Sequence, residues 1–412
     1  MKRLQKSLIA ISLATAAMLA PALAQKVTIN YMTFSAAPNY IETLDQTIAD
    51  FEAQNPNIEI KYQTAGWDNY FTKLQTLVAS GKEPDSYELN YENFVTYASG
   101  GALLNLDGLM AADSGFNKDI YNKRALDVFT YDGAQYGLVE SFSNVVLFYN
   151  KDLFDAAGVA YPAASWTWKD ELAAAQKLTN KDTGVWGTYA PIQFWEFYKT
   201  VAQNGGAILN NDKTKVVIDS PQNVETLTWM IDKITKYGVT PSDAEMGGQS
   251  PEDMFKAGKI AMLRTGIWML GAFQDLPFKW DIALEPGNTQ KAHHFFANGV
   301  VIAANSKNPD AAYKWIKFLT SSREAVELRI KAGWELPAVS DPAYIKGYLD
   351  QPIPPSRDVI FKALDTAVVP PVIGNWNQLT DVVGKQLDEA KLGRKTPAQA
   401  LADAAKAIKA LL

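Results

Sequence analysis

The chain of 412 residues contains no cysteine and only two histidines, His293 and His294. The absence of cysteine excludes disulfide bonds, thiolate metal sites, cysteine nucleophiles and a lipid-modified N-terminal cysteine. Two neighbouring residues in an extended segment point to opposite faces, so this histidine pair does not favour a shared metal ion. The sequence therefore predicts no bound metal and no cofactor, and two adjacent histidines leave little room for a histidine-based catalytic triad.

Other patterns are missing as well. The sequence has no phosphate-binding glycine loop of the Walker type and no acidic loop with calcium spacing. Its formal net charge is −6, from 39 basic and 45 acidic residues, and no segment concentrates the basic ones. Nucleic acid and anionic membrane surfaces are therefore poor partners. Beyond the first 24 residues no run of 18 apolar residues occurs, so we expect no membrane-spanning helix.

The first 24 residues have the features of a secretory signal peptide. Three basic residues lie within the first six positions, and residues 8–20 form an apolar stretch too short to span a bilayer comfortably. Ala22-Leu23-Ala24 then fits the cleavage rule of small residues. We expect cleavage before Gln25 and a mature protein free in the periplasm, because no cysteine is available for a lipid anchor. The alternative is an N-terminal membrane anchor.

The chain is long and contains many aromatic residues. A chain of 412 residues favours two domains over one. Alternating apolar residues predict strands at 27–31, 58–62 and 84–89, and apolar residues at helical spacing predict helices at 41–51 and 70–78. Strands that alternate with helices are typical of a mostly parallel, doubly wound sheet that is covered on both faces.

The same alternation continues downstream. Residues 145–149 form an apolar run typical of a buried strand. Helix starts are predicted at Thr167, with Asp170 three residues later, and at Ser220, where Pro221 suits the first helical position. The segment 396–399 predicts a capping box for the last helix.

Several short segments, each weak alone, follow one another in a fixed order over nearly the whole mature chain. They are 51–58, 80–85, 135–138, 147–154, 165–172, 258–262 with Gly266 and Trp268, and 305–308. In this order and spacing they resemble the extracellular solute-binding proteins of the maltose-binding type, the sugar receptors of ATP-binding-cassette importers.

The resemblance implies an α/β fold with two lobes, the periplasmic-binding-protein type II fold, in which each lobe is a doubly wound sheet. Three crossover segments would join the lobes near 141–144, 298–300 and 351–356. The N-lobe would comprise 25–142 plus 300–350, and the C-lobe 143–299 plus 351–412. A monomer of this kind would capture a mono- or oligosaccharide between its lobes by hinge closure and deliver it to a membrane permease.

A sugar site needs aromatic planes for the C–H faces and polar groups for the hydroxyls. The resemblance implies stacking roles for Trp268, Trp195 and Trp376, and loop signals add Trp67 and Trp334 as candidates. The other six tryptophans are expected in the core: Trp166, Trp168, Trp186, Trp229, Trp280 and Trp315.

The candidate polar residues lie at predicted strand ends and crossings. They are Ser35, Asp68, Asn90, Glu92, Asn93, Glu140, Ser141, Asn298 and Arg357. Arg357 also fits a structural ion pair, and His294 fits a hydrogen-bonding role as well as a ligand contact. Maltose-binding proteins carry an acidic residue near the position of Ser35 and this chain does not, which leaves the exact substrate open.

Two alternative functions remain open on the sequence. A receptor of this kind could bind a polyol, a glycerophosphodiester or a peptide in place of a sugar. The scarcity of arginine near the expected cleft counts against an anionic ligand, which usually recruits arginine. A secreted glycoside hydrolase would also be exported and rich in tryptophan, but it needs two carboxylates held across the scissile bond.

Overall fold

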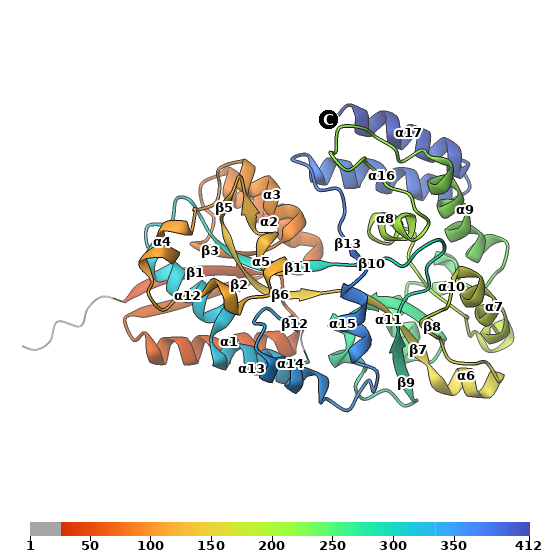
Figure 1. Cartoon of the computed structure of the whole chain (residues 1–412), viewed down its shortest axis with the longest axis horizontal. Coiled ribbons are helices and arrows are strands. Elements are labelled where there is room, and N and C mark those ends of the chain that lie inside the picture. Colours follow the sequence, from red (N-terminus) through yellow and green to blue (C-terminus); the bar gives the residue numbers. More distant parts are fainter. Residues whose placement is uncertain (1–25, 334) are drawn as a thin grey trace, which may run out of the picture.

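The computed structural model describes residues 26–412, except for residue 334 and the side chain of Asp68. The chain forms two α/β lobes that lie side by side along the long axis (Figure 1). The expected signal peptide, the cleavage site before Gln25 and Trp334 lie outside the described residues. No helix in the described part of the chain is long and apolar enough to cross a membrane.

The N-lobe is built around a sheet of six strands in the order β12-β6-β11-β3-β1-β2. Strand β1 pairs in parallel with β2 and β3, whereas β11 is antiparallel to both β3 and β6. The sequence predicted a mostly parallel sheet, but this sheet is mixed because β11 enters it from the other lobe and runs in the opposite direction. The strands are β1 (Val27–Thr33), β2 (Ile58–Thr64), β3 (Ser86–Asn90), β6 (Gly137–Ser143), β11 (Phe296–Ile302) and β12 (Leu336–Pro337).

The C-lobe contains a sheet of three strands with β7 in the centre. Both neighbours of β7 are antiparallel to it, a direction that the sequence pattern did not reveal. Two small ribbons complete the strands of the described chain: β10 with β13, and, in the N-lobe, the hairpin of β4 with β5. The strands are β7 (Val145–Asn150), β8 (Met262–Gly266), β9 (Trp280–Ala283), β10 (His293–His294), β13 (Ala367–Val368), β4 (Thr130–Tyr131) and β5 (Ala134–Gln135).

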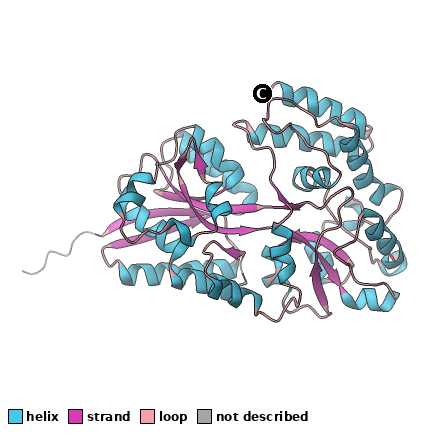
Figure 2. Cartoon of the chain, viewed as in Figure 1, coloured by secondary structure: helices cyan, strands magenta, loops and turns pink. Residues whose placement is uncertain are grey.

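Helices cover the sheets of both lobes (Figure 2). Those of the N-lobe are α1 (Pro38–Gln54), α2 (Trp67–Ala79), α3 (Tyr91–Ser99), α4 (Asp107–Ala112), η1 (Lys118–Ile120), α5 (Lys123–Asp127), α12 (Pro309–Ser321), α13 (Arg323–Lys331) and α14 (Pro342–Leu349). Those of the C-lobe are α6 (Lys151–Ala157), α7 (Trp168–Leu178), η2 (Lys181–Thr183), α8 (Phe194–Gln203), α9 (Pro221–Thr235), α10 (Asp243–Met246), α11 (Pro251–Lys256), η3 (Ile267–Met269), η4 (Gly271–Phe273), α15 (Asp358–Leu364), α16 (Trp376–Lys391) and α17 (Pro397–Lys409).

The predicted helix starts are confirmed. Thr167 and Asp170 form a capping box at the start of α7, and Thr396 and Gln399 form another before α17. The side chain of Ser220 accepts a hydrogen bond from a backbone N–H of the first turn of α9. Each cap satisfies donors that have no partner inside the helix, an effect of about 1 kcal/mol.

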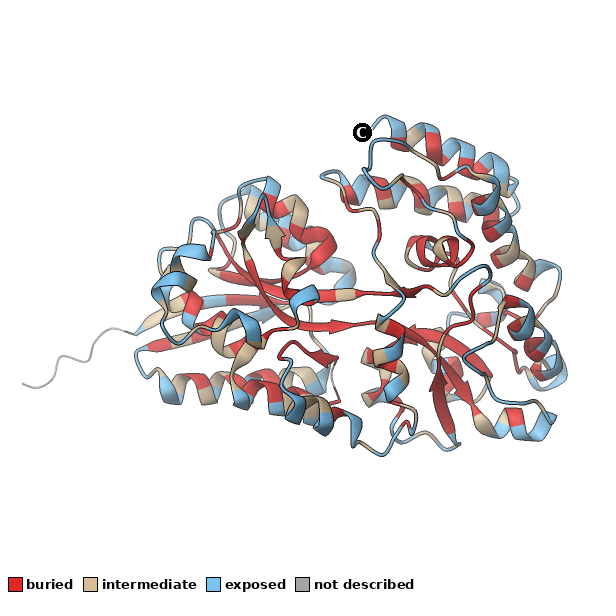
Figure 3. Ribbon diagram, in the orientation of Figure 1, coloured by how far each residue is buried: buried red, intermediate tan, exposed pale blue. Residues whose placement is uncertain are grey.

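The buried side chains form a hydrophobic core that continues from one lobe into the other. Figure 3 shows the strands buried and the outer faces of the helices exposed. In the N-lobe, Trp315 packs edge-on against Tyr31 and Phe51, with ring centroids 5.6 and 5.3 Å away. Of the six tryptophans expected in the core, Trp168, Trp186, Trp280 and Trp315 are buried, and Trp166 and Trp229 are half-buried.

The chain passes between the two sheets at three places. Strand β6 leads through Asn144 into β7, and β10 leads through Phe295 into β11. Because β11 pairs with β6 from Phe296 onward, the passage at Phe295 lies before the segment 298–300 where we expected it. The third passage lies between α14 and α15. The side-chain amide of Asn144 donates to the carbonyl of Ile360 at 2.7 Å, which ties the first passage to the third.

Candidate ligand-binding cleft

A cavity of about 1030 Å³ is lined by residues of both lobes. Typical sites for small molecules measure roughly 300–1,000 Å³, so this cavity lies at their upper limit. The N-lobe contributes Phe34, Ser35, Tyr40, Trp67, Asn90, Glu92, Asn298 and Glu335, among others, and the C-lobe contributes Tyr189, Trp195, Glu196, Glu252, Arg264, Thr265, Trp268 and His294. We call this cavity the cleft.

Aromatic rings from both lobes line the cleft. The ring of Phe296 lies 5.6 Å from that of Trp195 and 5.9 Å from that of Trp268, measured between centroids. Trp268 follows the end of β8, and its ring folds back over Gly266, where an added Cβ would lie 2.1 Å from the ring. Glycine is therefore required at this position. Trp67 is 46% exposed and lies edge-on to Phe34, with their ring centroids 5.1 Å apart.

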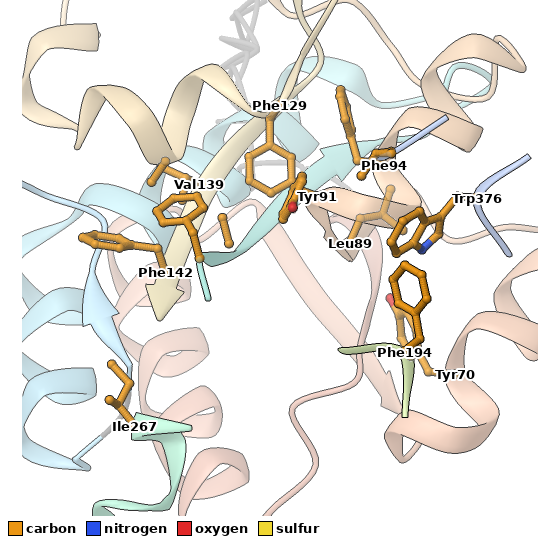
Figure 4. Close-up of a cluster of buried hydrophobic side chains, with 14 of the residues drawn as sticks. Tyr70, Leu89, Tyr91, Phe94, Phe129, Val139, Phe142, Phe194, Ile267 and Trp376 are labelled. Carbon is orange, nitrogen blue, oxygen red and sulfur yellow. The ribbon is translucent and has the colours of Figure 1, made fainter. Parts of the chain in front are cut away.

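Trp376 does not line the cleft, contrary to the expectation of a third stacking position. It is only 2% exposed and packs edge-on against Phe194, with ring centroids 5.3 Å apart (Figure 4). The ring of Trp195 also lies 5.9 Å from that of Trp376, measured between centroids. Its place follows from the packing of α16 on α8, which buries the first turn of α16. Trp376 thus supports Trp195 from behind.

Polar groups at the end of β3 face the cleft from the N-lobe. The amide of Asn90 donates to Oε2 of Glu92 at 2.6 Å, and both residues line the cleft. Asn93 lies behind them and donates to the side-chain oxygen of Asn90 at 2.8 Å. Burial raises the pKa of Glu92 to about 8, and its Oε1 is buried without a hydrogen-bond partner in the described part of the chain.

Ser35 lines the cleft in front of a second buried carboxyl. Its hydroxyl donates to the carboxylate of Glu88 at 3.3 Å, and the pKa of Glu88 is raised well above its ordinary value by burial and by the nearby Glu140. Glu140 itself does not line the cleft, because its carboxylate forms a buried ion pair with Arg329. This predicted ligand residue therefore serves the interior of the N-lobe.

Three residues meet where the chain passes between lobes. The hydroxyl of Ser141 and the amide of Asn298 both donate to Oε2 of Glu335, at 2.5 and 3.1 Å. Asn298 and Glu335 line the cleft, whereas Ser141 holds Glu335 from behind. Burial raises the pKa of the Glu335 carboxyl. The sequence pointed to this segment through Trp334 and missed Glu335.

Arg357 is a structural residue. It is 1% exposed, lies outside the cleft and donates to the carbonyl of Ile353 at 2.6 Å. Its guanidinium also lies over the ring of Tyr348, 4.9 Å from the centroid.

A cluster of buried charges lies under the C-lobe side of the cleft. Arg264 pairs with Glu171 at 2.5 Å, and Lys199 pairs with Glu196 at 2.7 Å and also with Glu285. We call these five residues the floor cluster. Burial alone would raise the pKa of Glu196, but the ammonium of Lys199 and the guanidinium of Arg264 lower it to about 2. Glu196 and Lys199 lie three residues apart on α8, whereas Glu171, Arg264 and Glu285 come from other parts of the chain, so only one pair of the cluster could be read locally from the sequence.

The only ligand-atom set with metal-like spacing among the described residues belongs to this region. Glu196, Glu285 and His294 offer atoms that all lie within 4.8 Å of one another. The ammonium of Lys199 already bridges the two carboxylates, so the protein supplies its own cation there. Burial lowers the pKa of His294 to about 4, and its Nε2–H donates to the carbonyl of Trp195 at 2.8 Å. His294 therefore holds the backbone of Trp195 in place.

The arrangement suits a ligand with apolar faces and many hydroxyls. Aromatic rings from both lobes offer apolar surface, and carboxyls and amides from both lobes supply hydrogen-bond partners. A cleft of this kind between two α/β lobes defines a ligand-binding receptor. The chain belongs to the bacterial extracellular solute-binding protein family, whose family model matches residues 37–326. The resemblance found in the sequence and the predicted two-lobed α/β fold are thereby confirmed.

Known proteins support this membership. The chain is similar to the ABC substrate-binding protein Lmo0181 from Listeria monocytogenes, whose structure is a complex with cycloalternan; the two are 48% identical, with a TM-score of 0.91, over 94% of this chain and 99% of that one. A binding protein of Brucella abortus (strain 2308) is 28% identical over 385 residues, which is 88% of each chain. The maltotriose-binding protein of Pyrococcus abyssi is 22% identical over 74% of this chain and 65% of its own length.

Proposed function

We propose that this protein is the substrate-binding receptor of an ATP-binding-cassette importer, which captures an oligosaccharide and delivers it to a membrane permease. The observation that carries the proposal is the cleft itself, about 1030 Å³ and lined by aromatic rings from both lobes. The similarity to Lmo0181, which binds cycloalternan, points to a sugar of several rings. The maltotriose-binding relative points the same way.

Ligand capture would use the two lobes as separate bodies. We take the N-lobe as 25–142 plus 300–350 and the C-lobe as 143–299 plus 351–412, and the pairing of β11 in the N-lobe sheet supports an earlier second boundary, at 295. A ligand closes the lobes only to the extent that its contacts are better in the closed state. Trp195 and Trp268 from the C-lobe would face Asn90, Glu92 and other polar groups of the N-lobe across the bound sugar.

The protein would act as an exported monomer without catalysis. Residues 1–24 would be removed before Gln25, and the mature receptor would move freely in the periplasm, since no cysteine is present for lipid attachment. Its family and its similar structures are binding proteins, which supports a role in transport over one in hydrolysis.

Isothermal titration calorimetry and thermal-shift assays test the proposal directly. Cycloalternan and maltotriose are the first probes, with a polyol and a glycerophosphodiester as alternatives. A sugar that binds only the folded state stabilises it by mass action and so raises the melting temperature. At a concentration one hundred times Kd, the unfolding free energy rises by about 2.7 kcal/mol. Binding of a glycerophosphodiester without any sugar, or steady release of reducing ends from the oligosaccharides, would refute the sugar-receptor function.

A further inference from the structure

Acidic side chains outnumber basic ones in the lining of the cleft. Glu92, Glu196, Glu252 and Glu335 line it, and Arg264 is the one Lys or Arg side chain among the described lining residues. A carboxylate or phosphate ligand usually depends on an arginine fork or a lysine for its recognition. The accessibility of Arg264 therefore decides whether the cleft can accept an anion.

The guanidinium of Arg264 is buried, and its charge is compensated by carboxylates of the floor cluster. Its side chain has no exposed surface, and it is paired with Glu171 at 2.5 Å and with Glu196 at 3.5 Å. Lys199, the other cation of the floor cluster, is also fully buried and is held by Glu196 and Glu285. His294 is neutral at physiological pH, because burial lowers its pKa to about 4. Each cation that the described residues place at or under the cleft is thus buried and already paired with a carboxylate of the protein.

Two carboxyl groups, in contrast, face the cleft from opposite lobes. Glu252 lies in α11, which packs on β8 of the C-lobe, and its Oε1 accepts from the hydroxyl of Thr265 at 3.1 Å. Glu335 lies beside β12 of the N-lobe sheet and accepts from Asn298 at 3.1 Å. Neither carboxyl forms an ion pair with any residue that the structure describes. A ligand held between the lobes would therefore meet an acid on each side.

We propose that the cleft selects its ligand by charge, and that Glu252 and Glu335 are the residues that admit neutral sugars and amino sugars but reject sugar acids and sugar phosphates. The inference rests on the proposed function and names the class of sugar that the receptor takes. An anion that enters the cleft loses its hydration and gains no counter-charge, whereas an ammonium group gains two acceptors. Like charges placed against an unwanted ligand are a recognised source of specificity.

A matched set of three ligands tests the proposal. The first is cycloalternan, the second carries one primary hydroxyl oxidised to a carboxylate, and the third carries an amine in that place. By calorimetry at pH 7 we expect the carboxylate to bind at least about tenfold more weakly than the parent and the amine to bind at least as tightly. In the double variant Glu252→Gln/Glu335→Gln the ratio between parent and carboxylate should fall below about threefold, since both acidic groups are replaced by amides of the same shape.

The control is Glu327→Gln, which removes an exposed carboxylate on α13 and should leave the ratio unchanged. If the double variant unfolds, the two single variants serve, and each should lower the ratio. A carboxylate that binds the wild type within threefold of the parent overturns the proposal, as does a folded double variant whose ratio equals that of the wild type.

The sugar-receptor function and the charge selection can be refuted separately. If cycloalternan and maltotriose both fail to bind, a thermal-shift panel of sugar acids, sugar phosphates and amino sugars decides the question of charge. Any acid or phosphate that raises the melting temperature overturns charge selection, and a panel in which amino sugars alone do so supports it.

Discussion

The floor cluster makes a sharp prediction about Lys199. Lys199→Met keeps the length of the side chain but removes the cation that is paired with Glu196 and Glu285, and all three side chains are buried. Removing one partner of a buried ion pair costs about 3–5 kcal/mol, because the remaining charge has neither water nor a partner. For domains of 150–250 residues this corresponds to a fall in Tm of roughly 6–20 °C.

The pH dependence of this loss identifies its cause. In the wild type the pKa of Glu196 is about 2, below the ordinary 4.5, so its contribution to stability is present above pH 4.5 and is lost as the pH falls toward 2. In the variant both carboxyls lose the ammonium of Lys199, and only the guanidinium of Arg264, 3.5 Å from Glu196, still opposes the effect of burial. Burial therefore raises their pKa relative to the wild type, and they become neutral as the pH falls. The difference in unfolding free energy between the two proteins should therefore be large at pH 8 and smaller at pH 5.

Urea unfolding followed by tryptophan fluorescence measures both quantities. The matched control is Lys362→Met, which removes an exposed lysine paired with Asp358 and should cost no more than about 1 kcal/mol. A loss below about 1 kcal/mol in Lys199→Met, or a loss that does not change between pH 8 and pH 5, would show that the cluster does not hold these charges as described.

Three further predictions separate binding residues from supporting ones. Trp268→Ala should weaken sugar binding by about 1–3 kcal/mol, since it removes ring surface that lines the cleft, and calorimetry showing equal affinity would place the ring outside the ligand contact. Trp376→Ala should lower the unfolding free energy by about 3–5 kcal/mol, because the ring is buried behind Trp195, and an unchanged urea midpoint would contradict this packing. Glu92 has a pKa raised to about 8, so it stabilises the fold in acid and this contribution is lost as the pH rises through 8; Glu92→Gln should remove that part of the fall in stability between pH 6 and pH 9, measured by urea unfolding.

The sequence predicted those parts of the fold that depend on local interactions. The helix starts at Thr167, Ser220 and Thr396 were found because a cap acts within one turn of its helix. The parallel pairing of β1 with β2 and β3 was also predicted, but the antiparallel pairings of β11 and of the C-lobe strands were not. Strands β7 and β8 are separated by more than 100 residues, and no local pattern records how such strands meet.

The candidate site was predicted in part for the same reason. Trp195, Trp268 and Asn298 line the cleft as expected, and the resemblance to a family supplied their positions. Trp376 and Glu140 come from the right segments but face the interior, because spacing along the chain does not tell which side of an element meets the cleft. Glu252 has no distinguishing neighbours in the sequence, and it reaches the cleft only through the packing of α11 on β8.

The two passages through Asn144 and Phe295 lie side by side, because β6 and β11 are paired neighbours in one sheet. Two adjacent connections, together with the third passage, restrict the relative motion of the lobes more than a single connection would. The orientation of the two halves of the cleft is therefore settled when the protein folds, before any ligand arrives. Two unconnected lobes would lose orientational entropy when a ligand brought them together. In this protein folding has already fixed much of that orientation, so more of the contact energy with the ligand remains as affinity.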